Sequence, residues 1–371
     1  MLKLFLIAGE PSGDRLGAAL MAGLKQLTEV EFRGIGGPMM QAQGLSSLVP
    51  MAELSVMGLA EVLPKYFALK RRIAEAAQAV TDWSPAALIT IDSPDFCLRV
   101  AGLVRAANPL QKTMHYVAPS VWAWRPHRAA RMARVIDHVL ALLPFEPPYM
   151  QDAGMTCDFV GHPVVAEPLA TAAERATMAG PYPLFLALPG SRRSEVSRLA
   201  PVIGAALGLI QAAHPQTRVA LPTVPHLTGL VRDLTASWPI TPQIIEDAAT
   251  KRAAFAMADV ALAASGTVSL ELAAAGCPMV IAYDMHPVTL WLTQRALRID
   301  TVTLVNLVSQ TRTVPEFIGK SCRADLIAPA VLALLQSPLG QQDAMHLTMQ
   351  RLGLGGAPPG LRAARSVLEH L

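Results

Sequence analysis

The sequence has little cysteine, little net charge and no long hydrophobic run, and each shortage excludes a class of protein. Its four cysteines lie far apart without any Cys/His cluster, which argues against a structural metal site and a disulfide framework and favours a reducing, cytoplasmic compartment. A net charge of +3 over 371 residues is too small to indicate a nucleic-acid partner. Every apolar run is interrupted well before the ~20 residues that a membrane-spanning helix needs.

Hydrophobic residues, by contrast, are abundant and make up 52% of the chain. Short apolar runs alternate with longer Ala-rich segments, which is the pattern of βα units in a parallel sheet, and the pattern occurs twice. We therefore expect an α/β protein with two parallel-sheet domains that face each other across a cleft. The expected strands are 2–8, 31–35, 86–91, 112–117, 138–142 and 158–160 in the first half, and 184–187, 217–220, 243–245, 260–263 and 279–282 in the second.

Prolines mark the expected domain boundary. Residues 161–183 contain four prolines among small residues, which is typical of a linker. We expect an amino-terminal domain at 1–165, a carboxy-terminal domain at 166–354 and, after a second Gly/Pro break, a tail helix within 355–371 that can pack back on the first domain. Ligands in such sheets bind beyond the carboxyl ends of the strands, so functional residues should follow the strands directly.

A polar turn, Glu10-Pro-Ser-Gly-Asp14, follows the first expected strand. Ser12 is a candidate N-cap, and the backbone amides of this turn could hold a phosphate or a polar sugar group at the start of a helix. The alternative is an ordinary capped turn between a strand and a helix. We interpret Glu10, Ser12, Gly13 and Asp14 as cleft residues on the acceptor side.

The turn Ile91-Asp-Ser-Pro-Asp-Phe96 points to acid–base chemistry. A strand that ends in two acidic residues around a proline presents at least one carboxylate to a cleft, and a sugar hydroxyl that attacks an anomeric carbon needs a base within hydrogen-bond reach. One of the two acids can instead cap the following helix. We assign the chemistry to Asp92 and the cap to Asp95.

Two tryptophans, Trp122 and Trp124, precede Arg125 and a cluster of further cations. Packing in a core explains one tryptophan, whereas two beside basic residues indicate a surface that stacks on a sugar or meets a membrane interface. We place Trp122 and Arg125 in the cleft, again on the acceptor side.

In the second half, a turn formed by Gly190, Ser191 and Arg192 leads directly from a strand into a helix. Arginine binds a diphosphate through bidentate, charge-assisted hydrogen bonds, so this turn is a candidate pyrophosphate clamp with Arg192 as its cation. The competing interpretation is that the neighbouring Arg193 pairs only with Glu195 or with solvent.

A second turn of small residues, Ser265-Gly266-Thr267, also lies between a strand and a helix and leaves amide donors for a phosphate. Glu271 should lie about one turn beyond Thr267, where its carboxylate can accept both ribose hydroxyls of a nucleotide. A solvated first-turn glutamate, stabilised by the helix dipole, explains this residue nearly as well. We interpret all four residues as donor-binding.

Taken together, these motifs resemble the lipid-A-disaccharide synthase family almost end to end. Ala-Gly-Glu-Pro-Ser-Gly-Asp at 8–14 and Val-Ala-Pro-Ser-Val-Trp-Ala-Trp-Arg at 117–125 are the longest specific matches. The chain departs from the family at Pro11 and Ser265, where threonine is frequent, and neither change removes a proposed chemical group. Further matches lie at 56–62, 91–96, 143–146, 159–163, 188–192 and 265–271.

The resemblance implies a GT-B fold of two Rossmann-like lobes and an inverting glycosyl transfer. The implied donor is UDP-2,3-diacylglucosamine, the acceptor is 2,3-diacylglucosamine 1-phosphate (lipid X), and the products are the β-1,6-linked lipid A disaccharide 1-phosphate and UDP, a step of lipopolysaccharide synthesis. Asp92 resembles the family's essential acid, Arg192 its phosphate-binding arginine and Asn306 a cleft residue of the second domain. The resemblance implies no metal or other cofactor, and it implies a homodimer.

Both implied substrates carry acyl chains, which suggests a use for the basic segment at 57–73. We expect this segment to dock on the anionic cytoplasmic face of the inner membrane, with the enzyme peripherally bound. Its apolar positions fit the core side of an ordinary amphipathic helix equally well. The residues expected to face the membrane are Met57, Lys65, Phe67, Lys70, Arg71 and Arg72.

Three other functions compete with this interpretation. An isomerase similar to UDP-N-acetylglucosamine 2-epimerase shares the two-lobed architecture, but its soluble substrate leaves the tryptophan-rich and basic surfaces unexplained. A non-catalytic sugar-nucleotide-binding protein would not need Asp92 or Arg192 for turnover. An NAD-dependent dehydrogenase is disfavoured because no G-x-G-x-x-G motif follows the first expected strand.

Overall fold

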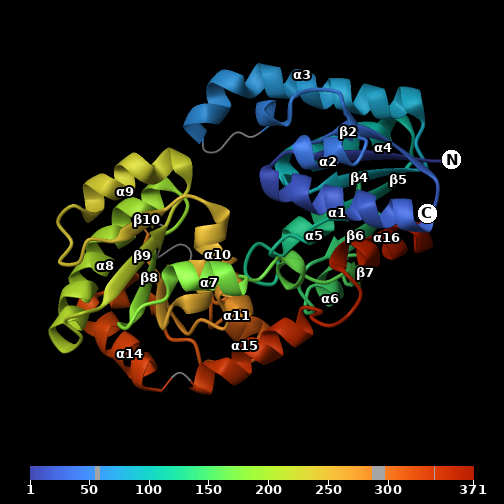
Figure 1. The fold of residues 1–371 in the computed structure, drawn as a ribbon. Helices are drawn as coiled ribbons and strands as arrows, with labels where there is room; N and C mark the ends of the chain where they lie inside the picture. Colours follow the sequence, from blue (N-terminus) through green and yellow to red (C-terminus); the bar gives the residue numbers. More distant parts are fainter. Residues whose placement is uncertain (55–58, 286–296, 338) are drawn as a thin grey trace. The chain divides into compact units, whose positions relative to one another are not determined.

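The structure, a computed structural model, describes residues 1–54, 59–285, 297–337 and 339–371. The chain divides into two compact units, which we call unit 1 (Met1–Ala166 with Gly355–Leu371) and unit 2 (Glu167–Leu354). In Figure 1 the red carboxy-terminal helix α16 accordingly lies with the blue amino-terminal elements. Unit 1 is therefore built from both ends of the chain.

Unit 1 contains a seven-stranded sheet in the order β3-β2-β1-β4-β5-β6-β7, in which every pair is parallel. Its strands are β1 Leu2–Ala8, β2 Val30–Ile35, β3 Ser46–Ser47, β4 Ala87–Ile91, β5 Lys112–Tyr116, β6 His138–Ala141 and β7 Thr156–Phe159. Its helices are α1 Pro11–Leu27, α2 Pro38–Ala42, α3 Leu59–Trp83, α4 Pro94–Ala107, α5 His127–Met132, α6 Pro147–Gln151 and α16 Pro359–Glu369, with 3-10 turns at Met51–Glu53 and Pro163–Ala166.

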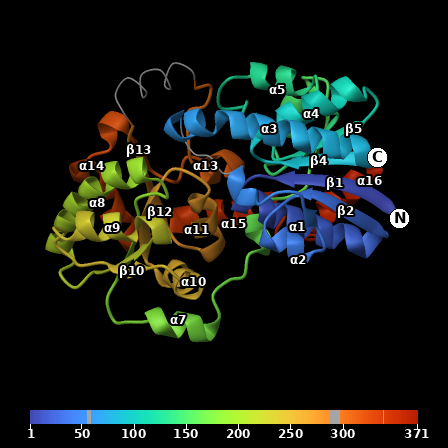
Figure 2. The same ribbon diagram turned by 90° about the horizontal axis from the view of Figure 1, so that it is seen from above.

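Alternate residues of the central strand β1 enter two separate cores. Leu4 and Leu6 pack with residues of α1 and α16, whereas Phe5 and Ile7 pack with residues of α3 and α4. Figure 2 shows the strands of this unit between α3 and α4 on one side and α1 and α2 on the other. Because side chains alternate along a strand, the continuous apolar run at residues 4–8 of β1 indicates helices on both faces of the sheet.

The tail helix α16 belongs to unit 1 because its backbone packs closely against α1. A Cβ at Gly23 of α1 would lie 2.6 Å from the carbonyl oxygen of Gly360, and a Cβ at Gly360 would collide with the carbonyl of Ala19. Glycine at both positions permits this approach. Ser366 adds polar contacts, since its hydroxyl lies 2.7 Å from Asp158 Oδ2 and 2.8 Å from His138 Nε2.

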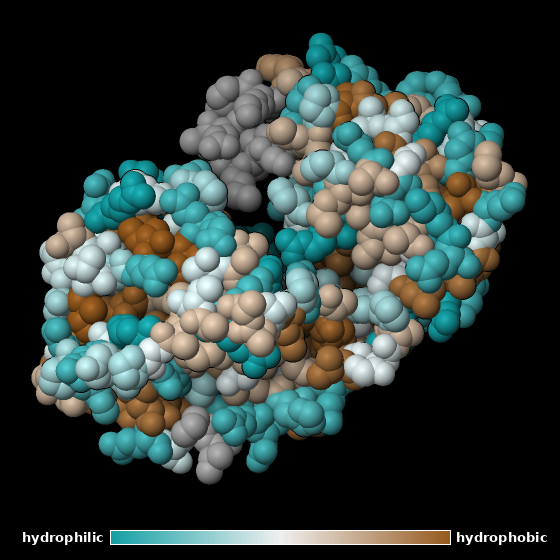
Figure 3. Space-filling model, in the orientation of Figure 1, coloured by the Kyte–Doolittle hydropathy of each residue, from teal (hydrophilic) through white to brown (hydrophobic). Residues whose placement is uncertain are grey.

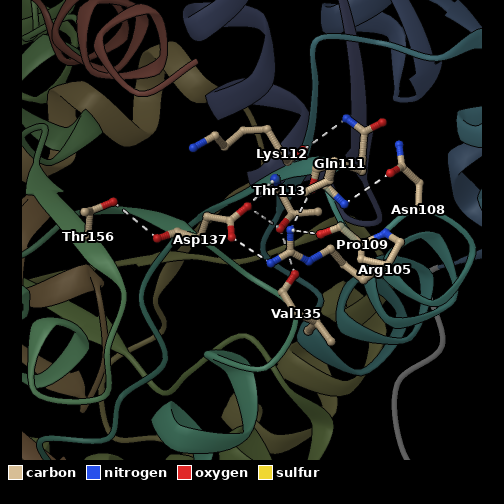
Figure 4. A network of polar contacts seen from close by, with 10 residues as sticks. Arg105, Asn108, Pro109, Gln111, Lys112, Thr113, Val135, Asp137 and Thr156 are labelled. Carbon is tan, nitrogen blue, oxygen red and sulfur yellow. Dashed lines mark hydrogen bonds and ion pairs between the residues drawn. The ribbon is translucent and has the colours of Figure 1, made fainter.

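A polar network joins α4, β5 and β6 at the amino-terminal edge of the same sheet (Figure 4). Asp137 accepts the backbone N–H of Thr113 at 2.9 Å and pairs with Arg105 Nη2 at 2.8 Å. Arg105 also donates to the carbonyl oxygens of Pro109 and Gln111, both at 3.0 Å. Charged groups at this edge serve the fold, and it is the opposite edge at which such sheets bind ligands.

Unit 2 contains a six-stranded parallel sheet in the order β10-β9-β8-β11-β12-β13. Its strands are β8 Leu184–Leu188, β9 Arg218–Pro222, β10 Gln243–Ile245, β11 Val260–Ala264, β12 Met279–Tyr283 and β13 Glu316–Ile318. Its described helices are α7 Ala172–Met178, α8 Arg193–Ala213, α9 Thr228–Thr235, α10 Ala248–Met257, α11 Val268–Ala275, α13 Leu304–Ser309, α14 Ala324–Gln336 and α15 Leu339–Arg351, with 3-10 turns at Pro225–Leu227 and Gly319–Ser321.

Among the described residues, α8 alone is long and apolar enough to cross a membrane by length and composition. Its residues Val196, Leu199 and Ile203 pack in the core of unit 2 with Phe185 of β8. On the face seen in Figure 3, exposed hydrophobic residues occur in small groups among hydrophilic ones.

The predicted α/β fold class with two parallel sheets is confirmed. Every predicted strand is present, and its ends are shifted by at most two residues. Two strands, β3 and β13, were not predicted; they contain two and three residues and lie at sheet edges. Strands this short are below the length at which an apolar pattern becomes recognisable.

Candidate active site

A cavity of about 590 Å³ opens in unit 2, and we call it the donor cavity. It is lined by segments that follow β8, β9, β10 and β11, which are neighbours in the sheet. Parallel strands end at one edge, so the loops that follow them meet there. All the predicted donor-binding residues except Asn306 line this cavity, namely Gly190, Ser191, Arg192, Ser265, Gly266, Thr267 and Glu271.

The turn at 190–192 is shaped by Glu195, which is only 9% exposed. Its carboxylate accepts the backbone N–H groups of Ser191 at 3.1 Å and Arg192 at 3.2 Å. Gly190 has φ +116°, and a Cβ there would lie 2.6 Å from Glu195 Oε2, so the turn requires glycine. Glu195 forms its ion pair with Arg192, at 2.6 Å, and the Arg192 side chain stays 66% exposed. Arg193 is exposed, which agrees with the alternative that it meets solvent.

The second turn places the start of α11 at the cavity wall. Gly266 has φ +151°, and Thr267 is the N-cap residue of α11, although its side chain makes no capping hydrogen bond. The Ser265 hydroxyl donates to the carbonyl of Val302 at 3.3 Å. The positive end of the helix dipole therefore lies beside the cavity, which favours an anion there.

Glu271 lies in the first turn of α11, as predicted, but its carboxylate has a partner that was not predicted. Lys251 of α10 places Nζ 2.6 Å from Glu271 Oε2 and 5.1 Å from the ring centroid of Phe255, and all three side chains line the donor cavity. One feature of the sequence could have indicated Lys251. Asp247 follows β10 by two residues and is the N-cap of α10, the helix that carries Lys251, and its side chain accepts the Thr250 N–H at 2.8 Å. Lys251 adds a cation to the cavity.

The assignment of Asn306 to the cleft needs correction, because its side chain is buried and used within unit 2. Asn306 is 1% exposed. Its amide donates to Thr301 Oγ1 at 3.2 Å and to the carbonyl of Val314 at 2.9 Å, and it accepts the Val314 N–H at 3.0 Å. In this structure Asn306 supports the fold of the segment around α13.

In unit 1, Asp92 directly follows β4 and is half-buried. Asp92 and Ser93 have φ +52° and +43°, a left-handed pair that Asp tolerates better than most residues. The Asp92 N–H donates to the carbonyl of Tyr116 at 3.0 Å. The predicted cap at Asp95 is wrong, because Ser93 is the N-cap residue of α4 and Asp95 is an exposed residue of the first turn.

The turn after β1 lies beside the Asp92 turn, since β1 and β4 are adjacent strands. The Ser93 hydroxyl donates to Glu10 Oε1 at 3.5 Å. The prediction of Ser12 as N-cap is wrong, because Glu10 occupies that position and Ser12 is exposed in the first turn of α1. Gly13 is buried, and a Cβ there would lie 3.3 Å from the carbonyl oxygen of Ile91.

Asp14 does not present its carboxylate to a substrate. It is 2% exposed and accepts the backbone N–H groups of Gly37 at 2.9 Å, Met39 at 3.0 Å and Met40 at 2.9 Å. These amides begin α2, so Asp14 caps a helix that follows the neighbouring strand β2. Its interpretation as an acceptor contact is replaced by a structural role.

Trp122 and Arg125 lie in the segment between β5 and α5. Trp122 is half-buried and donates its indole N–H to Glu146 Oε1 at 3.3 Å. Arg125 is exposed, has φ +51° and stacks over Trp124 at 4.2 Å from the ring centroid. The two predicted cleft residues therefore differ, since Trp122 faces inward and Arg125 faces solvent.

The residues predicted to face a membrane also differ in exposure and in ion pairing. Met57 and the Lys65 side chain lie outside the described residues. Phe67 is 81% exposed and Lys70 is exposed. Arg71 lies 3.4 Å from Glu75, and Arg72 pairs with Glu53 at 2.8 Å and with Glu75 at 2.6 Å.

Comparison with known proteins now identifies the family. Residues 4–355 match the model of the lipid-A-disaccharide synthetases. The chain belongs to the lipid-A-disaccharide synthetase family. A curated lipid-A-disaccharide synthase from Ruegeria pomeroyi is 61% identical over 100% of this chain and 96% of its own length. The synthase from Rhodospirillum centenum is 47% identical over 99% of this chain and 94% of its own.

Solved structures with much lower identity share the fold of this family member. UDP-GlcNAc 2-epimerase from Neisseria meningitidis bound to UDP-GlcNAc has a TM-score of 0.66 at 12% identity and covers 100% of this chain and 99% of its own. MurG from Acinetobacter baumannii has a TM-score of 0.58 at 14% identity over the same shares. At such identity the similarity shows the fold alone. The predicted family and its lipid-A-disaccharide synthase activity, a glycosyl transfer, are confirmed, whereas the epimerase alternative has only the shared fold in its favour.

Proposed function

We propose that the chain transfers 2,3-diacylglucosamine from UDP to the 6-hydroxyl of 2,3-diacylglucosamine 1-phosphate and releases UDP. The observation that carries this proposal is the donor cavity, because two turns of small residues, Arg192 and the start of α11 all line it. Amides, a guanidinium and a helix amino terminus are the groups that bind a diphosphate in proteins. Family membership supplies the sugar chemistry.

The roles of the donor residues follow from charge. Arg192 and the turn at 265–267 would stabilise the negative charge that grows on the departing UDP. Lys251 and Glu271, paired at 2.6 Å, offer a cation and an acceptor for the nucleoside part of the donor. The exposed Arg192 side chain can turn from Glu195 to a phosphate, because bidentate binding of a diphosphate outweighs a partly solvated ion pair.

Asp92 supplies the base in this proposal. Its carboxylate takes the proton of the acceptor hydroxyl while that oxygen forms the new bond to the anomeric carbon. The bond from the anomeric carbon to the diphosphate breaks, and its electron pair leaves with UDP. A single displacement inverts the anomeric centre, so an α-linked donor gives the β-1,6 linkage.

The acyl chains of both substrates make a membrane surface the natural source of donor and acceptor. We include peripheral binding to the inner membrane in the proposal, with exposed Phe67 and Lys70 of α3 as its contacts. A homodimer is a further part of it and follows from the family resemblance.

One assay tests the reaction directly. Purified protein is incubated with UDP-2,3-diacylglucosamine and lipid X, and UDP release is measured together with the disaccharide and the configuration of its new linkage. We expect one UDP per β-1,6-linked disaccharide, and no disaccharide when lipid X is omitted. Release of UDP without disaccharide, an α linkage, or epimerisation of UDP-N-acetylglucosamine in place of transfer would each contradict the proposal.

A further inference from the structure

Glu146 is a buried glutamate that binds the segment containing Trp122. It is 4% exposed and directly precedes α6. One carboxylate oxygen accepts the backbone N–H groups of Leu142 at 3.1 Å and Leu143 at 2.9 Å, and the other accepts the indole N–H of Trp122 at 3.3 Å. All three partners are neutral N–H donors, so these contacts supply hydrogen bonds to the carboxylate but no opposite charge.

Phe145, the residue before Glu146, also contacts Trp122. The Phe145 ring meets the Trp122 ring edge-on, with centroids 5.1 Å apart and planes at 82°. This geometry is the favourable arrangement for two aromatic rings, and the Trp122 indole N–H has its acceptor in Glu146. Phe145 and Glu146 together therefore determine both the position and the rotation of the indole.

The segment at 117–125 depends on such outside contacts because it has neither helical nor strand structure. Its ends are in the left-handed region, with φ +85° at Val117 and +51° at Arg125. Each such residue costs about 1–3 kcal/mol, most for a β-branched side chain, and persists only where its surroundings hold it. The loop after β6 contacts the 117–125 segment at the Trp122 indole, through Phe145 and Glu146.

The same segment starts beside Asp92. The N–H of Asp92 donates to the carbonyl of Tyr116, and the N–H of Val117 donates to the carbonyl of Leu140, both at 3.0 Å. Strands β4, β5 and β6 are neighbours in the sheet. The turn with Asp92, the segment with Trp122 and the turn that ends in Glu146 thus follow three adjacent strands at one edge.

We propose that Glu146 is a positioning residue that fixes Trp122 and thereby holds the 117–125 segment beside Asp92 for binding of the acceptor. This inference rests on the proposed function, since it assigns the segment to the acceptor side of that reaction. Glu146 acts through Trp122 and does not touch the substrate.

Protonation of Glu146 gives this role a measurable signature. Burial raises the pKa of Glu146 to about 7, against the opposing effect of its hydrogen bonds. The ionised carboxylate accepts all three N–H groups, whereas the protonated group carries an O–H with less capacity to accept. The charge of Glu146 also acts on Cys157 of β7, but burial raises the pKa of this thiol to about 12, so Cys157 stays neutral in the range where Glu146 titrates.

The first test is the fluorescence of the full chain titrated from about pH 5.5 to about pH 8.5, a range that brackets the raised pKa of Glu146 and lies above the ordinary pKa of a glutamate. We expect the emission of Trp122 to change with a midpoint near 7. Glu146→Gln and Trp122→Phe should each abolish this change. Trp238→Phe is the matched control, because it removes a buried indole of unit 2 and should leave the change intact. An unchanged titration in Glu146→Gln would overturn the proposal.

The second test separates positioning from simple structural support. Glu146→Gln should raise the KM for lipid X about tenfold and change the KM for the UDP-sugar by less than about twofold, because only the acceptor side loses its geometry. A lower melting temperature with both KM values unchanged would overturn the proposal. If Glu146→Gln does not fold, Trp122→Phe carries the kinetic test with the same expectation.

The two tests also distinguish failure of this inference from failure of the proposed function. Absence of disaccharide synthesis by the wild-type chain would contradict the function. The fluorescence titration needs no substrate, so it still decides whether Glu146 fixes Trp122.

Discussion

Both units use a buried carboxylate to hold a loop beyond a strand, but with different results. In unit 1, Asp14 is 2% exposed and all its described contacts are backbone N–H groups at the start of α2. In unit 2, Glu195 is 9% exposed and holds the turn at 190–192, whose own residues line the donor cavity. Asp14 therefore connects two parts of unit 1, whereas Glu195 shapes a turn whose residues remain accessible from the cavity.

Acidic residues at the same edge of a sheet can thus have different roles, which depend on their burial and their hydrogen-bond partners. Asp14 and Glu146 of unit 1 are buried and connect neighbouring loops, while Asp92 is half-buried at the same edge. A general base must come within hydrogen-bond reach of the proton that it takes, and a buried carboxylate whose oxygens already accept N–H groups has no such access. Among these three, only Asp92 combines access with the position expected of a base.

The largest effect should come from Asp92→Asn, which tests whether that distinction is real. We expect turnover to fall by about 10²- to 10⁴-fold, because the acceptor hydroxyl loses its base. Asparagine tolerates the left-handed conformation at φ +52° as aspartate does, so the backbone should persist. UDP release with saturating substrates measures turnover, and calorimetry with UDP should find unchanged affinity. Turnover close to that of the wild type would remove Asp92 from the mechanism.

A smaller effect, on structure rather than on chemistry, is expected for Asp14→Asn. The amide would direct an NH₂ group at one of three backbone N–H donors, costing about 2 kcal/mol. Hydrogen exchange at the amides of Met39 and Met40 should therefore accelerate by about 30-fold, as measured by mass spectrometry.

Asp95→Asn is the control for that variant, because Asp95 is exposed and should leave the exchange unchanged. UDP affinity should be the same in both variants. If Asp14→Asn instead weakened acceptor binding with normal exchange at α2, Asp14 would be a substrate contact after all.

Arg192→Ala tests the turn at 190–192 of unit 2, which Glu195 shapes. Removal of a charge-assisted contact to a phosphate should weaken UDP binding by about tenfold. Arg193→Ala is matched in charge and position, but Arg193 is not among the residues that line the cavity, so its effect should stay within about twofold. Calorimetry on the two variants compares them directly, and equal losses would mean that the turn binds anions only through general charge.

These contrasts also show which parts of the molecule could be read from the sequence. Both sheets were predictable because their central strands consist mainly of apolar residues. The turn at 190–192 was predictable because small residues and an arginine follow a strand. The role of Asp14 was not, since its partners lie 23–26 residues away and the motif around it fits a ligand loop equally well. The pairing of Lys251 with Glu271 spans 20 residues and two helices, and no local pattern records it.

The smallest expected effect is on membrane binding by α3. Here, too, a charged side chain that is paired within unit 1 should contribute less than one that is not. Arg72 is paired with Glu53 and Glu75, and its side chain is 22% exposed, whereas Lys70 is exposed near Phe67 in sequence. A basic residue near an anionic surface contributes about 1 kcal/mol, so Lys70→Gln should lower binding to vesicles that contain anionic lipid by about fivefold. Arg72→Gln should change it by less than about twofold, because its carboxylate partners already neutralise its charge. Co-sedimentation with anionic and neutral vesicles measures both variants, and a loss for Arg72→Gln as large as that for Lys70→Gln would show that ion pairing within unit 1 does not decide which charges meet the membrane.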